Sequence, residues 1–366
     1  MSGAFVAALG GPGELSDLQA VSVAAITYSM TGFRFDASSL PATTPTELAL
    51  ALSDRAAPWR TRILHVMLIG ALLLEEIPAT LQKRIEDYAE ALGVHDDMLT
   101  VTSGLAAGSL AAARDDFQRS GYEGDWSQSE SLQTDHQLDH AWDIVEHDPA
   151  LAGKWAALEN CPPRSLGRGV FEFYTARGFA YPGQPGSAPP LLAQHDWVHV
   201  LVDYGSTVES EIEVFSFIAM ANEDPRAFSL QAMVLSLFES GHLQSGAGLF
   251  EADLGHLSEE GDRMAVRMGD AMRRGFLCGT NTDGRDLLDI DWFSLSHRPI
   301  EDLRREFHIV PKHQDAWEAG SVTAWEAGGI SPFQSRTGQA EAQAADRLYE
   351  SYGASPGATT SAPVDD

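Results

Sequence analysis

Apolar residues recur every three or four positions through much of this chain, which is the spacing of one face of an α-helix. In the first third, this pattern predicts helices over residues 44–52, 60–74, 79–92 and 96–117. Gly93 is a typical helix end, and Asp96 or Asp97 is a suitable N-cap for the helix that follows. The pattern therefore predicts an all-α fold that begins with a helical bundle.

Helical spacing continues in the second half of the chain. Asp148-Pro149 is a start signal for a helix, and a further helix is expected over residues 168–177 after the Pro162-Pro163 break. Residues 228–238 are apolar nearly all round, which favours a buried helix. Residues 258–274 are amphipathic and carry four arginines. These arginines form either a solvated face or a site for an anionic headgroup: Arg263, Arg267, Arg273 and Arg274.

Polar stretches divide the chain into four predicted parts. We expect a helical accessory or interaction domain over 1–120, an acidic linker with a short helix over 121–147, a metal-binding domain over 148–335, and a mostly disordered tail over 336–366. The tail is expected to hold one short helix near 340–352. The Pro- and Gly-rich stretch 181–190 is either a wall of the metal cleft or a connector.

The charge balance excludes several classes of partner. A formal net charge of −29 argues against binding of nucleic acid and against electrostatic adsorption to anionic lipid. The two cysteines, Cys161 and Cys278, provide neither a disulfide framework nor a Cys-rich zinc site, so a reducing cytoplasm is the expected location. The longest apolar stretch, 63–74, is too short to span a bilayer, and no transmembrane segment is expected.

One motif is suited to chemistry. His195-Asp196-Trp197-Val198-His199 places two imidazoles on one helix face, and Glu211 follows after eleven residues. Two histidines and a carboxylate can hold a metal ion and leave a position for water or substrate. Two partly buried histidines satisfied by hydrogen bonds are the alternative.

Glu211 reaches the histidines only if the helix is interrupted, because on one helix it would lie about 18 Å beyond His199. Gly205 is the expected end of the first helix, and Ser206-Thr207-Val208-Glu209 resembles a capping box that opens a second helix over 208–221. Asp203, at i+4 from His199, is expected on the histidine face as a further ligand or a base. Asp196 is expected to orient a histidine or to be a fourth ligand.

The motif resembles the signature of the coenzyme Q biosynthesis protein 4 family, His-Asp-x-x-His-x(11)-Glu, at each fixed position. Weaker similarity flanks it at residues 167–174, 287–292 and 298–307. The resemblance covers roughly residues 150–312. It departs from many bacterial relatives at Trp197, which stands one place earlier than their Trp, and at Asp203, where they tend to have Gly.

This resemblance implies an all-α fold and a divalent metal, usually zinc, held by His195, Asp196, His199 and Glu211. It also implies a place at the inner membrane face in ubiquinone or prenylquinone biosynthesis. There the protein would act on a prenylated aromatic precursor by ring decarboxylation coupled to hydroxylation, or would organise the enzymes that do. The candidate catalytic residues are Asp196 and Asp203, and Asp203 is a candidate because of its expected position on the histidine face, not because of the resemblance. The apolar segment 228–238 would then be a surface for the prenyl chain. The N-terminal helices faintly resemble the tellurite-resistance B-like domain.

Two alternatives stay open at this stage. In the first, the protein is a non-catalytic lipid-binding scaffold or adaptor with a structural metal, and its N-terminal helices recruit protein partners. In the second, the metal site is vestigial and the protein is a helical adaptor, and homo-oligomers are compatible with each of these functions. A second cluster can chelate metal on one helix face, although no signature matches it: His136, Asp139, His140 and Asp143. A metalloprotease is disfavoured because Asp196 replaces the Glu that such a site needs after its first His.

Overall fold

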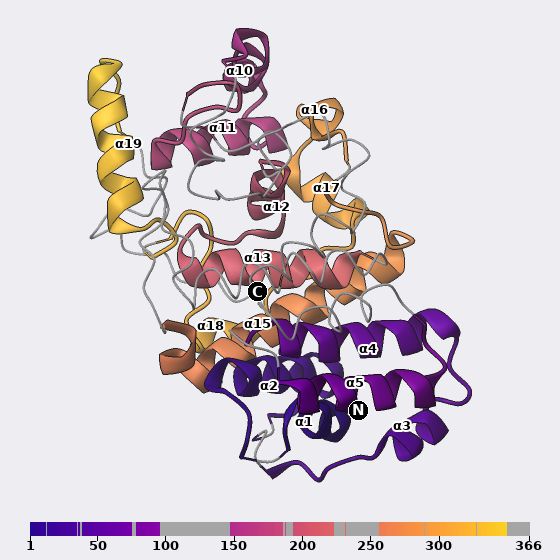
Figure 1. The fold of residues 1–366 in the computed structure, drawn as a ribbon. Helices are drawn as coiled ribbons and strands as arrows, with labels where there is room; N and C mark the ends of the chain where they lie inside the picture. Colours follow the sequence, from indigo (N-terminus) through magenta and orange to yellow (C-terminus); the bar gives the residue numbers. More distant parts are fainter. Residues whose placement is uncertain are drawn as a thin grey trace.

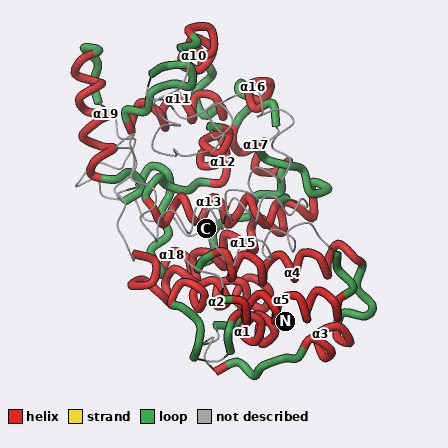
Figure 2. The backbone as a smooth tube through the Cα atoms, viewed as in Figure 1, coloured by secondary structure: helices red, strands yellow, loops and turns green. Residues whose placement is uncertain are grey.

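The computed structural model confirms the all-α fold. It describes residues 1–95, 147–222, 231 and 256–349, apart from 12, 35, 37–38, 75–77, 186, 188–192, 289 and 327. Helices and loops make up this part of the chain, and no strand occurs within it (Figure 2). None of the described helices is long and apolar enough to cross a membrane.

The N-terminal helices form one packed group (Figure 1). Ser16 and Thr44 each make a capping box, in which the side chain of the cap and the side chain three residues later satisfy backbone N–H groups reciprocally. Gly32 and Gly93 end two of the helices in the left-handed conformation. The helices are α1 (Ser2–Leu9), α2 (Asp17–Thr31), α3 (Pro45–Ala51), α4 (Ala57–Leu72) and α5 (Ala79–Leu92).

The remaining helices form a middle and an upper part in Figure 1. The middle contains α13 (Val208–Ala221) and the long α15 (His256–Asn281), which run across the molecule between the N-terminal helices and the others. The short α18 (Gln314–Glu318) lies near one end of α15. The upper part contains α10 (Pro149–Ala156), α11 (Leu166–Arg177), α12 (Gln194–Val202), α16 (Trp292–Leu295), α17 (Ile300–Glu306) and α19 (Pro332–Ala344).

Glycines let α15 approach its two neighbours closely. A Cβ atom on Gly275 or Gly279 would collide with the carbonyl oxygen of Phe217 or Ala221 in α13. A Cβ atom on Gly269 would collide with Tyr28 in α2. Backbones can approach this closely only where no side chain separates them. Helix α15 is therefore packed between α2 and α13.

Two apolar cores lie on either side of α2. Val23 of α2 packs with α1 and α3–α5, and Ala219 of α13 joins that N-terminal core. Leu18, Val21 and Ala25 of α2 belong instead to the larger core around α11–α13 and α15. Each core therefore contains side chains from the N-terminal helices and from the second half of the chain.

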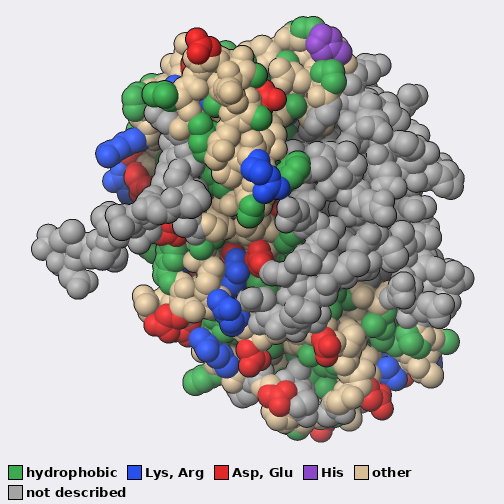
Figure 3. Space-filling view, turned by 90° about the vertical axis from the view of Figure 1, so that its left-hand side faces the viewer, with side chains coloured by type: hydrophobic (Ala, Val, Ile, Leu, Met, Phe, Trp, Pro, Cys, Tyr) green, Lys and Arg blue, Asp and Glu red, His purple; other side chains and the backbone are tan. Residues whose placement is uncertain are grey.

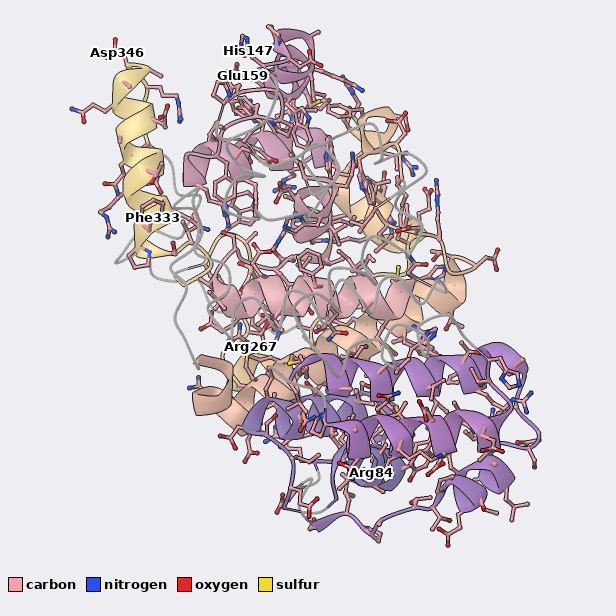
Figure 4. All side chains as sticks on the ribbon, in the orientation of Figure 1. Arg84, His147, Glu159, Arg267, Phe333 and Asp346 are labelled. Carbon is pink, nitrogen blue, oxygen red and sulfur yellow. The ribbon has the colours of Figure 1, made fainter. Side chains whose placement is uncertain are left out.

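A buried ion pair links α13 to α15. The guanidinium of Arg267 on α15, labelled in Figure 4, lies 2.8 Å from Oε2 of Glu213 on α13, and both side chains are buried. Arg274 is buried as well. These two arginines therefore serve packing and do not form a solvated basic face. On the face shown in Figure 3, charged side chains of both signs are interspersed.

Several predicted elements have other bounds in the structure or lie outside the described residues. The C-terminal helix begins at Pro332, not near residue 340, because Ser331 and Gln334 form a capping box there. The predicted helices over 96–117 and 228–238 lie outside the described residues, apart from Gln231. The predicted domain boundary at 120, most of the linker 121–147, the second histidine cluster and the tail beyond Tyr349 also lie outside them.

Candidate metal centre

Helix α12 positions the two histidines and is buried from its second residue onward. Every residue from His195 to Val202 is buried, which is unusual for a helix that carries two histidines and an aspartate. Trp197 anchors the opposite side of this helix, with its ring centroid 5.5 Å from Trp155 and 5.1 Å from Phe293. The polar residues of α12 therefore face the protein interior.

Two arginines satisfy the carbonyl groups at the C-terminal end of α12. Arg274 Nη2 donates to the carbonyl of Val202 at 2.8 Å, and Arg304 Nε donates to that of Leu201 at 2.8 Å. The last carbonyls of a helix have no partner within the helix and carry a partial negative charge. The two arginines donate hydrogen bonds to these carbonyls and offset their partial negative charge. This helix end can therefore be buried, and its position is fixed.

The turn after α12 differs from the prediction. The helix ends at Val202, and Asp203 is its left-handed C-cap with φ 66°. Gly205 lies two residues further on, packed so closely against Gly329 that a Cβ atom would not fit. The residue before α13 is Thr207, and its side chain makes no capping hydrogen bond.

The predicted capping box at Ser206 is wrong because the Ser206 hydroxyl has other partners. It donates to Oε1 of Gln334 at 2.8 Å and accepts a hydrogen bond from Nε of Arg177. Arg177 is fully buried over the Phe173 ring and also binds the carbonyls of Ala324 and Gly329. Tertiary contacts, not a local cap, hold the turn.

The turn brings Glu211 to both histidines, as predicted. Its Oε2 atom lies 3.2 Å from Nε2 of His195 and 3.2 Å from Nε2 of His199. Ligand atoms around a tetrahedral zinc ion with bonds of about 2.0–2.1 Å lie about 3.3 Å apart. Both histidine–glutamate distances therefore match the spacing of ligand atoms in a metal site, and both are also hydrogen-bond distances.

Asp196 extends the cluster. Among the described residues, His195, Asp196 and His199 form the group whose donor atoms lie within 4.8 Å of one another, and Oδ1 of Asp196 is 3.6 Å from Nε2 of His195. The hydroxyl of Tyr174 on α11 donates to Oδ2 of Asp196 at 2.6 Å. Tyr174 itself is stacked against Tyr181, at 5.6 Å between ring centroids. Tyr181, in the predicted 181–190 loop, thus packs on a residue that supports the site.

Aromatic rings fix the two imidazoles. His195 stacks on Phe215 of α13 with 5.0 Å between ring centroids, and His199 lies 5.4 Å from Phe173 of α11. The side chain of His195 is 9% exposed and that of His199 is fully buried. Both rings are therefore held before any ion binds, which lowers the entropic cost of coordination.

Burial and the histidines shift the two carboxyl pKa values in opposite directions. Burial raises the pKa of Asp196, and His195, His199 and the Tyr174 hydroxyl offset this only in part. Burial also acts to raise the pKa of Glu211, but the two histidines outweigh it and hold this pKa well below its ordinary value. Glu211 is thus an anion at neutral pH, the state that a metal ligand requires.

The donor set fits a divalent cation. Two imidazole nitrogens and one carboxylate oxygen are a ligand set that zinc uses when a further position is left for water or substrate. Tyr174 orients the adjacent Asp196, as outer hydrogen-bond partners do in metal sites. His195, His199 and Glu211 would hold the ion, and Asp196 would be a fourth ligand or orient the water.

Asp203 does not join the predicted site. Because the helix ends before it, the i+4 geometry that would place it beside His199 does not apply. Its Oδ1 atom instead accepts a long hydrogen bond, 3.4 Å, from the backbone N–H of Ala324. This hydrogen bond connects the end of α12 to the loop before α19.

Sequence reasoning missed the residues that support the site. The sequence indicated no role in the site for Tyr174, Arg177 or Arg304. Each makes its contacts with residues distant in the chain, so no local spacing reveals them. For Tyr174, the signal that was available is a hydroxyl among the apolar residues of its helix, where a buried polar group needs a partner.

The chain matches no family model, and no curated protein matches it.

Proposed function

We propose that this chain is a metal-dependent protein of the coenzyme Q biosynthesis protein 4 type. In this proposal, His195, His199 and Glu211 hold a divalent ion, with zinc the first candidate. The substrate is an aromatic ring that carries a prenyl chain and a carboxyl group, and the reaction is ring decarboxylation coupled to hydroxylation. The carboxyl group leaves as CO₂, and dioxygen from solution is the two-electron oxidant that supplies the hydroxyl oxygen. The protein acts in the cytoplasm at the inner face of the membrane.

The observation that carries the proposal is the position of Glu211. Its Oε2 atom is equidistant from the two histidine Nε2 atoms, at 3.2 Å from each, although it comes from another helix. Convergence of three donors on one point, with a carboxylate kept ionised by its surroundings, supports a cation site.

In this proposal, the ion and the residues around it have separate roles in the reaction. A bound divalent ion supplies Lewis acidity toward an oxygen substituent of the ring and stabilises the negative charge that develops there. Asp196, whose pKa is raised by burial, is suited to hold a proton on Oδ1 beside His195. Tyr174 binds the other oxygen and fixes the direction in which Oδ1 points. Phe173 and Phe215 exclude water from the imidazoles.

Burial of the cluster favours a second candidate function. The four residues are at most 7% exposed, as in a structural metal site closed to solvent. In that case the protein is a non-catalytic scaffold, and the metal stabilises the α12–α13 turn. The two functions differ in whether the metal keeps a position for an exogenous ligand.

The first prediction is loss of metal on removal of a ligand. Purified protein should bind one equivalent of zinc in isothermal calorimetry. His195→Ala and Glu211→Gln should weaken binding by more than the roughly 10–100-fold that loss of an outer hydrogen-bond partner costs. Circular dichroism verifies that both variants fold. The matched control is His147→Ala, because His147 is exposed on the chain before α10 (Figure 4).

Full zinc occupancy in His195→Ala would overturn the metal assignment. The reaction is tested separately, by mass spectrometry of an organic extract of the zinc-loaded protein. A co-purified prenylated aromatic acid, and its loss of CO₂ on incubation with the protein, supports catalysis. Stoichiometric zinc without such a compound or turnover supports the scaffold.

A further inference from the structure

A cavity lies between the N-terminal helices and the α13–α15 pair, away from the histidines of the metal centre. Its volume is about 480 Å³, within the range of roughly 300–1,000 Å³ that small-molecule sites occupy. Six helices supply apolar walls, among them Phe5 of α1, Ile26 of α2, Ile63 of α4, Met220 of α13 and Phe276 of α15. The cavity is therefore built from the N-terminal helices and from two helices of the second half of the chain.

The cavity is separate from the metal centre but shares a helix with it. Met220 and Glu211 are nine residues apart on α13, about 13.5 Å at 1.5 Å per residue. The cavity also requires α1, α2 and α4, which supply none of the donors of the metal centre. Binding in the cavity is therefore independent of whether the histidines bind metal.

The walls of the cavity include exposed apolar side chains. Met30 and Trp59 are 41% and 43% exposed, although large apolar side chains are usually covered. The Trp59 ring packs edge-on against Phe276, with 6.1 Å between centroids. This arrangement lets an apolar chain enter from the surface without first opening the packed core.

Positive charge collects at this cavity in an otherwise acidic protein. The chain has 24 Lys and Arg against 53 Asp and Glu, yet the charged side chains that line the cavity are three arginines and no carboxylate: Arg55, Arg62 and Arg273. Arg62 holds the wall, because its Nη2 donates to the carbonyl of Met220 at the end of α13.

The other two arginines have weakly held guanidinium groups. The ion pairs of Arg55 with Asp54 and of Arg273 with Asp270 are 3.9 Å and 3.8 Å long. Charge-assisted hydrogen bonds are about 2.7–2.9 Å, so an oxyanion would form closer contacts with either guanidinium than these carboxylates do. The two side chains are 60% and 44% exposed, as expected for groups that meet a ligand head at the surface.

We propose that this cavity binds a single-chain amphiphile, with its apolar chain between α1, α2, α4 and α15 and its oxyanion head group on Arg55 and Arg273. The shared chemistry of the ligand is an unbranched or branched hydrocarbon chain that ends in a carboxylate or a phosphate monoester. The apolar walls select against small polar metabolites, and the arginines select against neutral lipids.

The test uses the full-length protein and defined probes below their critical micelle concentrations. Isothermal calorimetry compares dodecanoate, dodecyl phosphate and dodecanol, with acetate and inorganic phosphate as probes that have no chain. The two dodecyl anions should bind in one equivalent, dodecanol at least tenfold more weakly, and acetate and phosphate without measurable affinity. Tighter binding of dodecanoate assigns a carboxylate ligand, and tighter binding of dodecyl phosphate assigns a phosphate ligand.

Two variants locate the binding site. Arg55→Gln combined with Arg273→Gln should weaken anion binding at least tenfold, whereas Arg305→Gln, at an exposed arginine on α17, should not change it. Ala51→Trp adds bulk at an exposed position of the wall and should abolish binding without disturbing the core. Absence of anion binding to the wild type, unchanged binding in Ala51→Trp, or equal affinity for dodecanol would each overturn the proposal.

Discussion

At the scale of single residues, the hydroxyl of Tyr174 has the most direct effect on the candidate metal centre. It donates to Asp196 across 2.6 Å in a fully buried environment. Burial raises the pKa of this hydroxyl far above its ordinary value, so it remains a donor at any physiological pH. The bond therefore supports Asp196 without competing for the metal.

Tyr174→Phe should weaken zinc binding by about 10–100-fold and lower the free energy of unfolding by about 1–3 kcal/mol. The reason is that a buried carboxylate loses its donor while the ring packing remains. Zinc titration by calorimetry and urea unfolding measure the two effects. Tyr28→Phe is the matched control, because Tyr28 also donates to an aspartate, Asp315, away from the site. Equal zinc affinity in both variants would contradict the role of Tyr174.

The residues of the site could be predicted where their chemistry depends on their spacing along the chain. The i, i+4 histidines and a carboxylate beyond a turn were visible in the sequence, and the structure brings His195, His199 and Glu211 together. Asp203 was misplaced because its predicted position assumed one more helical residue than α12 has. Arg304 could not be predicted, because its contact with Leu201 joins residues about a hundred positions apart.

At the scale of elements, the contact between α13 and α15 depends on the absence of side chains. Gly275 and Gly279 are one helical turn apart on α15 and both meet α13. Since α13 carries Glu211 near its start, this contact also determines where the third donor lies. A small change in the distance between these helices would move Glu211 relative to the histidines.

Gly275→Ala should therefore destabilise the protein by about 1–3 kcal/mol, as overpacking of a close contact does. Zinc affinity should fall with it. Thermal unfolding and zinc titration are the measurements. Gly153→Ala is the control, because Gly153 is a helical glycine of α10 with no atom near a built Cβ. This variant should be stabilised by roughly 0.5–1 kcal/mol. A neutral Gly275→Ala would mean that α13 and α15 separate at little cost.

Helix bounds could be predicted where no tertiary contact competed with the local capping signal. The predicted helix over 79–92 coincides with α5, whose C-cap is the expected Gly93. The start of α13 was predicted correctly, but from the wrong cap, since Ser206 binds Gln334 rather than the first turn. The side chain of Ser206 has two competing sets of partners, and the sequence around it contains only one of them.

At the scale of the whole molecule, α2 connects the two apolar cores. Its side chains divide between them, with Val23 in the N-terminal core and Val21 in the larger one. A boundary drawn from sequence at residue 120 follows the composition of the chain. The packing joins α2, which precedes that boundary, to α15, which follows it, because an apolar helix face is buried wherever a complementary face lies in space.

The described cores should consequently unfold together. Scanning calorimetry should show one transition, with equal calorimetric and van't Hoff enthalpies. Zinc at about 100 times its Kd should stabilise this single transition by about 2.7 kcal/mol. Unfolding in two transitions, of which only one shifts with zinc, would show that the N-terminal helices fold independently. His195→Ala is the control, and its transition should not respond to zinc.

The position of α2 in the chain also has a consequence during protein synthesis. Helix α2 ends at Thr31, and α15, which covers Leu18, Val21 and Ala25, begins at His256. At roughly 5–20 residues per second, a ribosome needs on the order of 10–45 s to make the intervening chain. During that interval, the apolar face of α2 that packs against α15 is exposed, while its other face already packs with α1 and α3–α5. The nascent chain is then most prone to aggregate and most in need of a chaperone.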